Sequence, residues 1–138
     1  MNPTLVQTSI ILFQASYITI EYVPECEWLY VNWRGEVNKE MAIDGNEKIL
    51  LAIKKYQVKK LLNNNSYITG NWNKIVKRLM KIWFPRFFGS GLMFVAWVQS
   101  PCIASQKSLQ KALKHQLDNV TILVFEDIEI ASAWLNEV

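Results

Sequence analysis

The stretch GLMFVAWV, residues 91–98, decides the fold class of this chain. Its residues are apolar at nearly every position, so a strand formed there would be buried on both of its faces. Such strands lie in the centre of parallel sheets, because the helices that connect parallel strands cover both sides of the sheet. A second apolar run, residues 120–125, has the same character. The sequence therefore predicts an α/β fold with a mostly parallel sheet.

Helical spacing of apolar residues predicts four helices around these strands. Gly45 lies in the middle of the first one, where it would cost about 1 kcal/mol relative to alanine, and this indicates close packing against another backbone. Asn38 and Asp127 are suitable N-caps for the first and last helices. Pro85 is expected to end or kink the second helix. The predicted helices lie at 38–56, at 71–84, around 109–117 and at 127–138.

Strand periodicity dominates the N-terminal part of the chain. Residues 17–23 and 28–33 alternate between two faces and are joined by a short turn, which predicts an antiparallel hairpin. Residues 9–13 are a candidate edge strand, and 58–62 form a short strand. We expect a single domain over residues 1–138. It would hold a mostly parallel sheet of about five strands with an N-terminal antiparallel hairpin, flanked by four helices.

Composition restricts the function classes. Of the 138 residues, 51% are hydrophobic and 20% are charged, as in an ordinary globular domain. The net charge of +3 is spread over several segments, so no nucleic-acid partner is expected. Two distant cysteines and one histidine, His115, predict neither a disulfide scaffold nor a metal or cofactor site. No signal peptide or transmembrane segment is predicted, and the cytoplasm is the expected location.

Five segments carry a resemblance to a known family: 29–35 (LYVNWRG), 60–65 (KLLNNN), 94–98 (FVAWV), 125–127 (FED) and 133–135 (AWL). They resemble the STAS-like superfamily, which contains sulfate-transporter and anti-sigma factor antagonist domains. More closely, the chain resembles small bacterial proteins that share this fold. The resemblance covers nearly the whole chain from Tyr17 onward, and it implies a regulatory protein-interaction role without catalysis.

The phosphorylation motif of the anti-sigma factor antagonists is only partly matched. That family carries a phosphorylatable serine in an Asp-Ser-Ser/Thr-Gly-Leu stretch. In the corresponding region of this chain, Thr69 and Gly70 match the Ser/Thr-Gly pair, but Ile68 occupies the position of the serine and no aspartate precedes it. Ser66 lies nearby, out of register. A phosphoryl switch here would need Ser66 or Thr69 as its acceptor.

The carboxyl edge of the parallel strands is the first candidate site, because ligands of open α/β sheets bind beyond those strand ends. After the predicted strand at 58–62 comes a polar run of Asn63, Asn64, Asn65 and Ser66, and a second loop follows at 99–100. Asparagine amides both donate and accept, and the next helix N-terminus offers free N–H groups to an anion. The alternative is that these residues only form a turn.

The second predicted helix is the other candidate surface. Lys77 and Arg78 belong to its basic side, which would suit an acidic protein groove or an anionic membrane, unless it is only a solvated face. Trp72 and Trp83 belong to its aromatic side, which would either line a pocket for an apolar small molecule or lipid, or fill the core. A homodimer interface at residues 87–88 is also expected. The aromatic group comprises Trp72, Trp83, Phe84, Phe87, Phe88 and Trp97.

Catalytic motifs are absent from the sequence, which lacks GxSxG, P-loop, HExxH and GxGxxG patterns. His115 has no histidine or cysteine near it in the sequence. Cys102 lies at a predicted helix start, where the dipole lowers a thiol pKa, but no base stands at a known spacing. We expect a non-enzymatic protein-interaction module that binds its partner through the second helix and the asparagine run. The alternative is a domain that binds a small apolar ligand or lipid.

Overall fold

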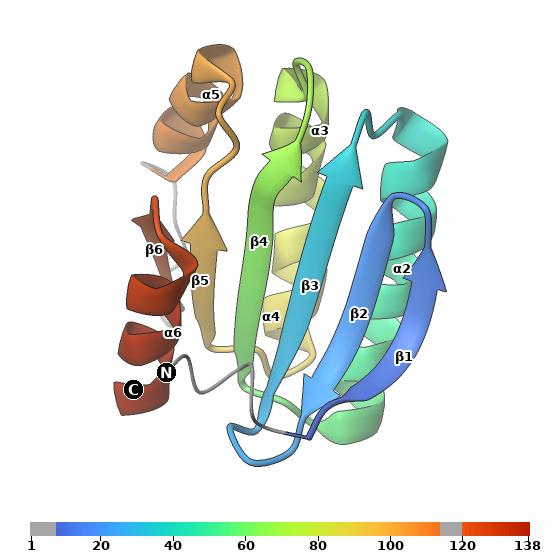
Figure 1. Cartoon of the computed structure of the whole chain (residues 1–138), viewed down its shortest axis with the longest axis vertical. Coiled ribbons are helices and arrows are strands. Elements are labelled where there is room, and N and C mark those ends of the chain that lie inside the picture. The colour runs from blue at the N-terminus through green and yellow to red at the C-terminus, as the bar shows by residue number, and fades with distance from the viewer. Residues whose placement is uncertain (1–7, 114–119) are drawn as a thin grey trace.

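The computed structural model describes residues 8–113 and 120–138, and its centre is a six-stranded sheet. The strands follow one another across the sheet in the order of the sequence (Figure 1). The first three strands are antiparallel, and the third to the sixth run parallel. They are β1 (Ile10–Ala15), β2 (Ile18–Val23), β3 (Trp28–Gly35), β4 (Lys60–Ile68), β5 (Phe94–Val98) and β6 (Thr121–Phe125).

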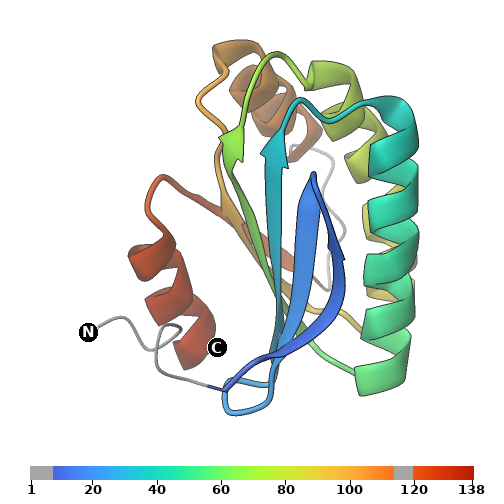
Figure 2. The same ribbon diagram turned by 45° about the vertical axis from the view of Figure 1, so that its right-hand side comes forward.

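Helices cover both faces of the sheet (Figure 2). Those that connect the parallel strands pack on one face and bury the larger core with it, whereas the last helix packs on the opposite face over a smaller core. The helical elements are α2 (Lys39–Tyr56), α3 (Asn73–Arg78), the π-helical turn η1 (Leu79–Trp83), α4 (Phe84–Gly89), α5 (Ile103–Leu113) and α6 (Ile128–Glu137).

The predicted α/β architecture is confirmed, and the described strands number six where about five were expected. β1 occupies the candidate edge position and extends to Ala15. The antiparallel hairpin of β2 and β3 forms as its alternation predicted. On β3, Val31 and Trp33 belong to the larger core, whereas Trp28 and Tyr30 pack in the smaller one. Successive residues of a strand point to opposite faces, so one strand serves both cores.

The predicted close approach at Gly45 is also present, although its neighbours are side chains and not a backbone. A Cβ at Gly45 would lie 2.5 Å from Cη2 of Trp33 and 3.0 Å from Cδ1 of Ile18. Glycine therefore allows α2 to pack directly on β2 and β3. The predicted cap is confirmed as well, since Asn38 Oδ1 accepts a hydrogen bond from the Met41 N–H at 2.9 Å.

Three tryptophans form the middle of the larger core. Trp33, Trp72 and Trp97 are each at most 3% exposed. The ring centroid of Trp72 lies 6.2 Å from that of Trp33 and 6.2 Å from that of Trp97. They come from β3, the loop before α3, and β5 respectively. The contact between their rings therefore ties the start of α3 to the centre of the sheet.

Of the two effects expected of Pro85, an end or a kink, the helix does not end there, because helical residues continue past it. A π-helical turn, η1, directly precedes α4, and Pro85 lies in the first turn of α4. In a regular helix the proline ring would clash with the carbonyl group four residues earlier, and its missing N–H would leave that carbonyl unbonded. The wider π turn changes this hydrogen-bond spacing, and the first turn of a helix tolerates proline.

The crossover helices determine where a ligand can bind. The helices after β3, β4 and β5 all pack on the same face, and the strand order does not reverse within the sheet. Doubly wound folds bind ligands in the crevice that forms where the strand order reverses. The described sheet has no such reversal. The space between neighbouring helices is therefore the alternative place for a site.

Candidate functional site

The asparagine run lies inside the sheet, so the predicted loop at residues 63–66 is wrong. β4 continues through it to Ile68, and Asn63, Asn64 and Asn65 are at most 2% exposed. Asn63 and Asn64 pair with residues of both β3 and β5. This pairing on both sides satisfies the backbone, and it overrides the preference of asparagine for turns. A partner cannot reach these three side chains in this structure.

Hydrogen bonds compensate for the burial of two of these amides. The indole N–H of Trp33 donates to Asn63 Oδ1 at 3.2 Å, and Asn64 Nδ2 donates to the hydroxyl of Tyr30 at 3.1 Å. Asn64 Oδ1 in turn accepts from the Ser66 hydroxyl at 2.7 Å and from the Ser66 N–H at 3.0 Å. The run therefore has a structural role between β3 and β5.

Ser66 and Thr69 lie at the end of β4, and both are exposed. Ser66 lies two residues before the end of β4. Thr69 directly follows the strand, and its N–H donates to the Gly35 carbonyl at 3.0 Å. Neither residue lines the cleft described below. Phosphorylation of either one stays a prediction.

Most of the predicted aromatic pocket is packed core. Trp72, Phe84, Phe87 and Trp97 are at most 3% exposed, and Phe84 contacts Phe87 and Trp97 at centroid distances of 5.6 and 5.9 Å. Phe87 is fully buried, so its predicted exposure at a homodimer interface is wrong. Its position in the first turns of α4, after Pro85, turns its side chain inward onto the core. Trp83 differs from the others because it borders a cleft.

Lys77 and Arg78 lie on an exposed basic face, as predicted. We refer to the five exposed cations on α3, η1 and α4 as the basic face. In the sequence, no aspartate or glutamate occurs between Glu47 and Asp118. The positive charges of this segment therefore have no negative charge within the segment to offset them. That long interval without acids was visible in the sequence and marks this surface. The basic face consists of Lys74, Lys77, Arg78, Lys81 and Arg86.

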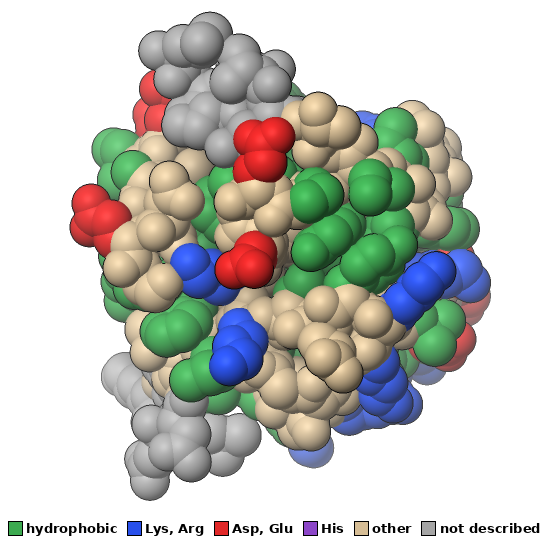
Figure 3. All heavy atoms as spheres, turned by 90° about the horizontal axis from the view of Figure 1, so that it is seen from below, with side chains coloured by type: hydrophobic (Ala, Val, Ile, Leu, Met, Phe, Trp, Pro, Cys, Tyr) green, Lys and Arg blue, Asp and Glu red, His purple; other side chains and the backbone are tan. Residues whose placement is uncertain are grey.

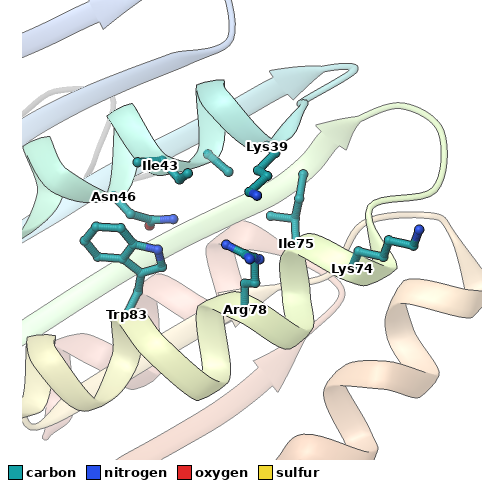
Figure 4. Close-up of a pocket in the computed structure, with 8 residues that line it drawn as sticks. Lys39, Ile43, Asn46, Lys74, Ile75, Arg78 and Trp83 are labelled. Atoms are coloured by element: carbon teal, nitrogen blue, oxygen red, sulfur yellow. The ribbon is translucent and has the colours of Figure 1, made fainter.

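A cleft of about 280 Å³ separates α2 from α3 and η1 (Figure 4). Its rim carries three cations, Lys39 from α2 and Lys74 and Arg78 from α3. Its walls are mostly apolar. Of the residues singled out in the sequence, the cleft brings together Arg78 and Trp83, and it leaves out Trp72 and Lys77. The lining residues are Lys39, Ala42, Ile43, Asn46, Lys74, Ile75, Arg78 and Trp83.

Asn46 is the unusual residue of this cleft. It is only 2% exposed, and its Oδ1 has no hydrogen-bond partner among the described residues. Its amide projects from α2 toward the space between Trp83 and Arg78 (Figure 4). A buried amide without a partner costs about 1–3 kcal/mol, so such a group needs an explanation. Sequence analysis missed it, although Asn46 interrupts the buried stripe of Ala42 and Ile49 at helical spacing.

Charge in the cleft is not balanced within the described part of the chain. Lys39, Lys74 and Arg78 form no ion pair with any residue at 8–113 or 120–138, where an ion pair joins Lys48 to Asp44. Arg86 lies over the ring of Trp83, 4.8 Å from its centroid, and supports the indole from outside. The π-helical turn brings Trp83 to the cleft. The arrangement can accept an anion beside an apolar group.

A second groove, of about 210 Å³, lies between β1 and α2. Its cations are already engaged. Lys48 pairs with Asp44 at 3.5 Å and lies over the ring of Phe13, and Lys55 lies over that of Tyr56. Figure 3 views the end of the molecule where α2 finishes, and it shows hydrophobic side chains gathered there with basic side chains beside them. This groove is therefore less suited to an anion than the cleft.

Catalytic and metal-binding groups add little. No cluster of three or more potential metal ligands was found among the described residues, which exclude His115. Hydrogen bonds from the Ser105 hydroxyl and from backbone N–H groups hold the pKa of the Cys102 thiol below its usual range, against a smaller opposing effect of burial. A thiol of lowered pKa without an identified base defines no reaction. In the described part of the chain, no helix is long and apolar enough to cross a membrane.

Comparisons with known proteins show likeness at the level of the fold. No family model and no curated protein match this chain. A chain in the crystal structure of the diguanylate cyclase SiaD in complex with its activator SiaC, from Pseudomonas aeruginosa, is similar with a TM-score of 0.49 and 10% identity, covering 86% of this chain and 99% of that chain. A structure of SiaC of Pseudomonas aeruginosa gives 0.47 and 9% over the same shares. Membership of the STAS-like superfamily stays a prediction.

Proposed function

We propose that this chain is a non-enzymatic regulatory module that binds an acidic protein partner through its basic face, in the cytoplasm. The observation that carries the proposal is the set of five exposed cations on α3, η1 and α4, with no acid in that segment. A field of one sign speeds association with a partner of opposite charge and rejects partners of like charge. The resemblance to the STAS-like superfamily implies a partner-binding role of this kind, and of the two expected docking surfaces, the second helix and the asparagine run, the proposal keeps the helix.

The first experiment is affinity capture from the native host cells at low salt, followed by identification and purification of the retained protein. Binding of the purified pair is then measured by calorimetry. We expect the double variant Lys77→Glu/Lys81→Glu to weaken binding at least tenfold, because both side chains are exposed and lie outside the cleft. Lys54→Glu is the matched control, since Lys54 is exposed on α2, away from the basic face.

Salt dependence provides a second readout of the same interaction. Raising the ionic strength shortens the Debye length from about 10 Å at 0.1 M to about 3 Å at 1 M, so association should slow markedly. A partner that binds the double variant as tightly as the wild type, with the same salt dependence, would show that the basic face is only a solvated surface.

A further inference from the structure

The cleft between α2 and α3 has the features of a ligand site, and it shares Lys74 and Arg78 with the basic face but not Lys77, Lys81 or Arg86. We propose that it binds a small organic acid. The carboxylate lies at the rim between Lys39 and Arg78, and the hydrocarbon part lies against Ile43 and Trp83 (Figure 4). This inference does not depend on the protein partner proposed above.

Charge selects the carboxylate. Three cations from two helices line one rim; Lys39 and Arg78 turn toward one another there, whereas the Lys74 side chain extends away from them (Figure 4), and none of the three has an ion-pair partner among residues 8–113 and 120–138. Arg78 presents a planar guanidinium, which bonds a carboxylate through two parallel N–H groups. Lys39 adds a second charge from α2 (Figure 4). A neutral ligand of the same shape would leave this attraction unused.

Asn46 supplies the second, independent observation. Its side chain is 98% buried, its amide points into the cleft, and its Oδ1 bonds no other described residue (Figure 4). Burial of this oxygen without a hydrogen-bond donor is unfavourable, so packing alone does not explain an asparagine at this position. The amide lies deeper than the three cations. It can therefore donate to an oxygen atom of a ligand that enters between them.

Size and wall chemistry restrict the ligand further. The volume of about 280 Å³ lies just below the usual range of about 300–1,000 Å³ for ligand pockets, so a long lipid chain would not fit inside. An acidic side chain of a partner protein would leave the apolar walls at Ile43 and Trp83 uncovered. A short aliphatic or aromatic acid matches both parts of the cleft, because its carboxylate can bind the cations of the rim and its hydrocarbon part can cover the apolar walls. We take octanoate as the probe, and 1-octanol as its neutral counterpart.

The test follows the indole and side-chain amide signals of the ¹⁵N-labelled protein by NMR during titration with each probe. Octanoate is expected to shift the signals of Trp83 and Asn46 in a saturable way, and 1-octanol to bind at least about tenfold more weakly. Arg78→Gln and Lys39→Gln should each weaken octanoate binding by roughly tenfold. Lys39 is exposed, so its variant tests the rim without disturbing the core. Trp83→Phe assigns the indole signal.

Lys54→Gln, on the exposed side of α2 and outside the cleft, is the matched control and should bind octanoate like the wild type. Equal binding of octanoate and 1-octanol would mean that the cleft is only an apolar hollow, and would overturn the proposal. Absence of any saturable shift at Trp83 would overturn it too, as would octanoate affinity that survives both rim variants. The double variant Lys77→Glu/Lys81→Glu should bind octanoate like the wild type. Octanoate binding and binding of the protein partner can therefore be tested separately.

Discussion

Single residues set the spacing between α2 and the sheet, and Gly45 is the clearest case. Gly45→Ala would add helix propensity of about 1 kcal/mol, but the new Cβ would lie 2.5 Å from Trp33. Overpacking of a core costs roughly 1–3 kcal/mol, and Trp33 is held between Tyr17 and Trp72. We therefore expect a net loss of up to about 2 kcal/mol in the free energy of unfolding, measured with urea.

Gly89→Ala is the matched control for that prediction. A Cβ at Gly89 meets no atom within 4 Å, and its φ is not positive. The same chemical change should therefore be neutral or slightly stabilising at Gly89. Equal stability of the two variants would contradict the view that α2 packs on Trp33 through this glycine.

Tyr17 provides a pH-dependent contact at the same scale. Its hydroxyl donates to Asp44 Oδ2 at 2.6 Å and ties the turn between β1 and β2 to α2. Burial first, and then the hydrogen bond to Asp44, raise the pKa of Tyr17 to about 12 from 10.0. The unfolded chain therefore loses the proton near pH 10, while the folded chain keeps it. The stabilisation is present below pH 10 and is lost as the pH rises through about 12.

Tyr17→Phe should consequently be less stable than the wild type near pH 8, and the difference should shrink between pH 10 and 12. The same hydrogen bond lowers the pKa of Asp44 below its usual 3.8, so the difference should also shrink as the pH falls below that value. Urea unfolding of both proteins across the pH range measures it. A difference that stays constant from pH 3 to 12 would show that the hydrogen bond contributes nothing.

Among the elements, β4 departs most from what its sequence suggests. Its three asparagines favour turns locally, and no periodicity marks them as buried. The strand persists because β3 and β5 bond it on both sides, and because Trp33 and Tyr30 bond two of its amides. These partners are distant in the sequence. The apolar run of β5 and the alternation of β3 could be predicted because their patterns are local.

Asn63→Ala tests this account of β4. It would leave the buried indole N–H of Trp33 without its acceptor, and an unsatisfied buried donor costs about 1–3 kcal/mol. We expect a loss of that size in the free energy of unfolding. In a Trp33→Phe background, which removes the donor, the same substitution should cost less, and a double-mutant cycle isolates the pair. Additive losses would mean that the two side chains are not coupled.

For the molecule as a whole, the sequence predicted the order of elements, the hairpin and the parallel strands, but not the cleft. Residues of α2 and of α3 with η1 form it, and these helices are separated by β4. Single-helix patterns identified Arg78 and Trp83 as members of a basic and an aromatic side. Only the packing of two helices on one face brings them to Lys39 and Asn46. The spacing of residues within one helix does not predict which residues of another helix will lie beside it.

The two cores share the central strands, and this predicts one cooperative unit. Leu62 of β4 and Ala96 of β5 face α6, whereas Leu61 and Val95 face the larger core. Leu135 of α6 is fully buried in the smaller core. Leu135→Ala removes buried methyl groups and leaves a cavity, which should lower the free energy of unfolding by about 2–5 kcal/mol. That is a large fraction of the roughly 5–15 kcal/mol of a typical domain.

Coupling through the shared strands means that this loss should appear in every probe. Tryptophan fluorescence reports mainly the larger core, and far-ultraviolet circular dichroism reports all helices, so both transitions should move together to the same lower urea concentration. Asn136→Ala, at the exposed position of α6 that follows Leu135, is the control and should stay within about 0.5 kcal/mol of the wild type. Separate transitions would instead show that α6 unfolds independently, because the strands would then hold the larger core without it.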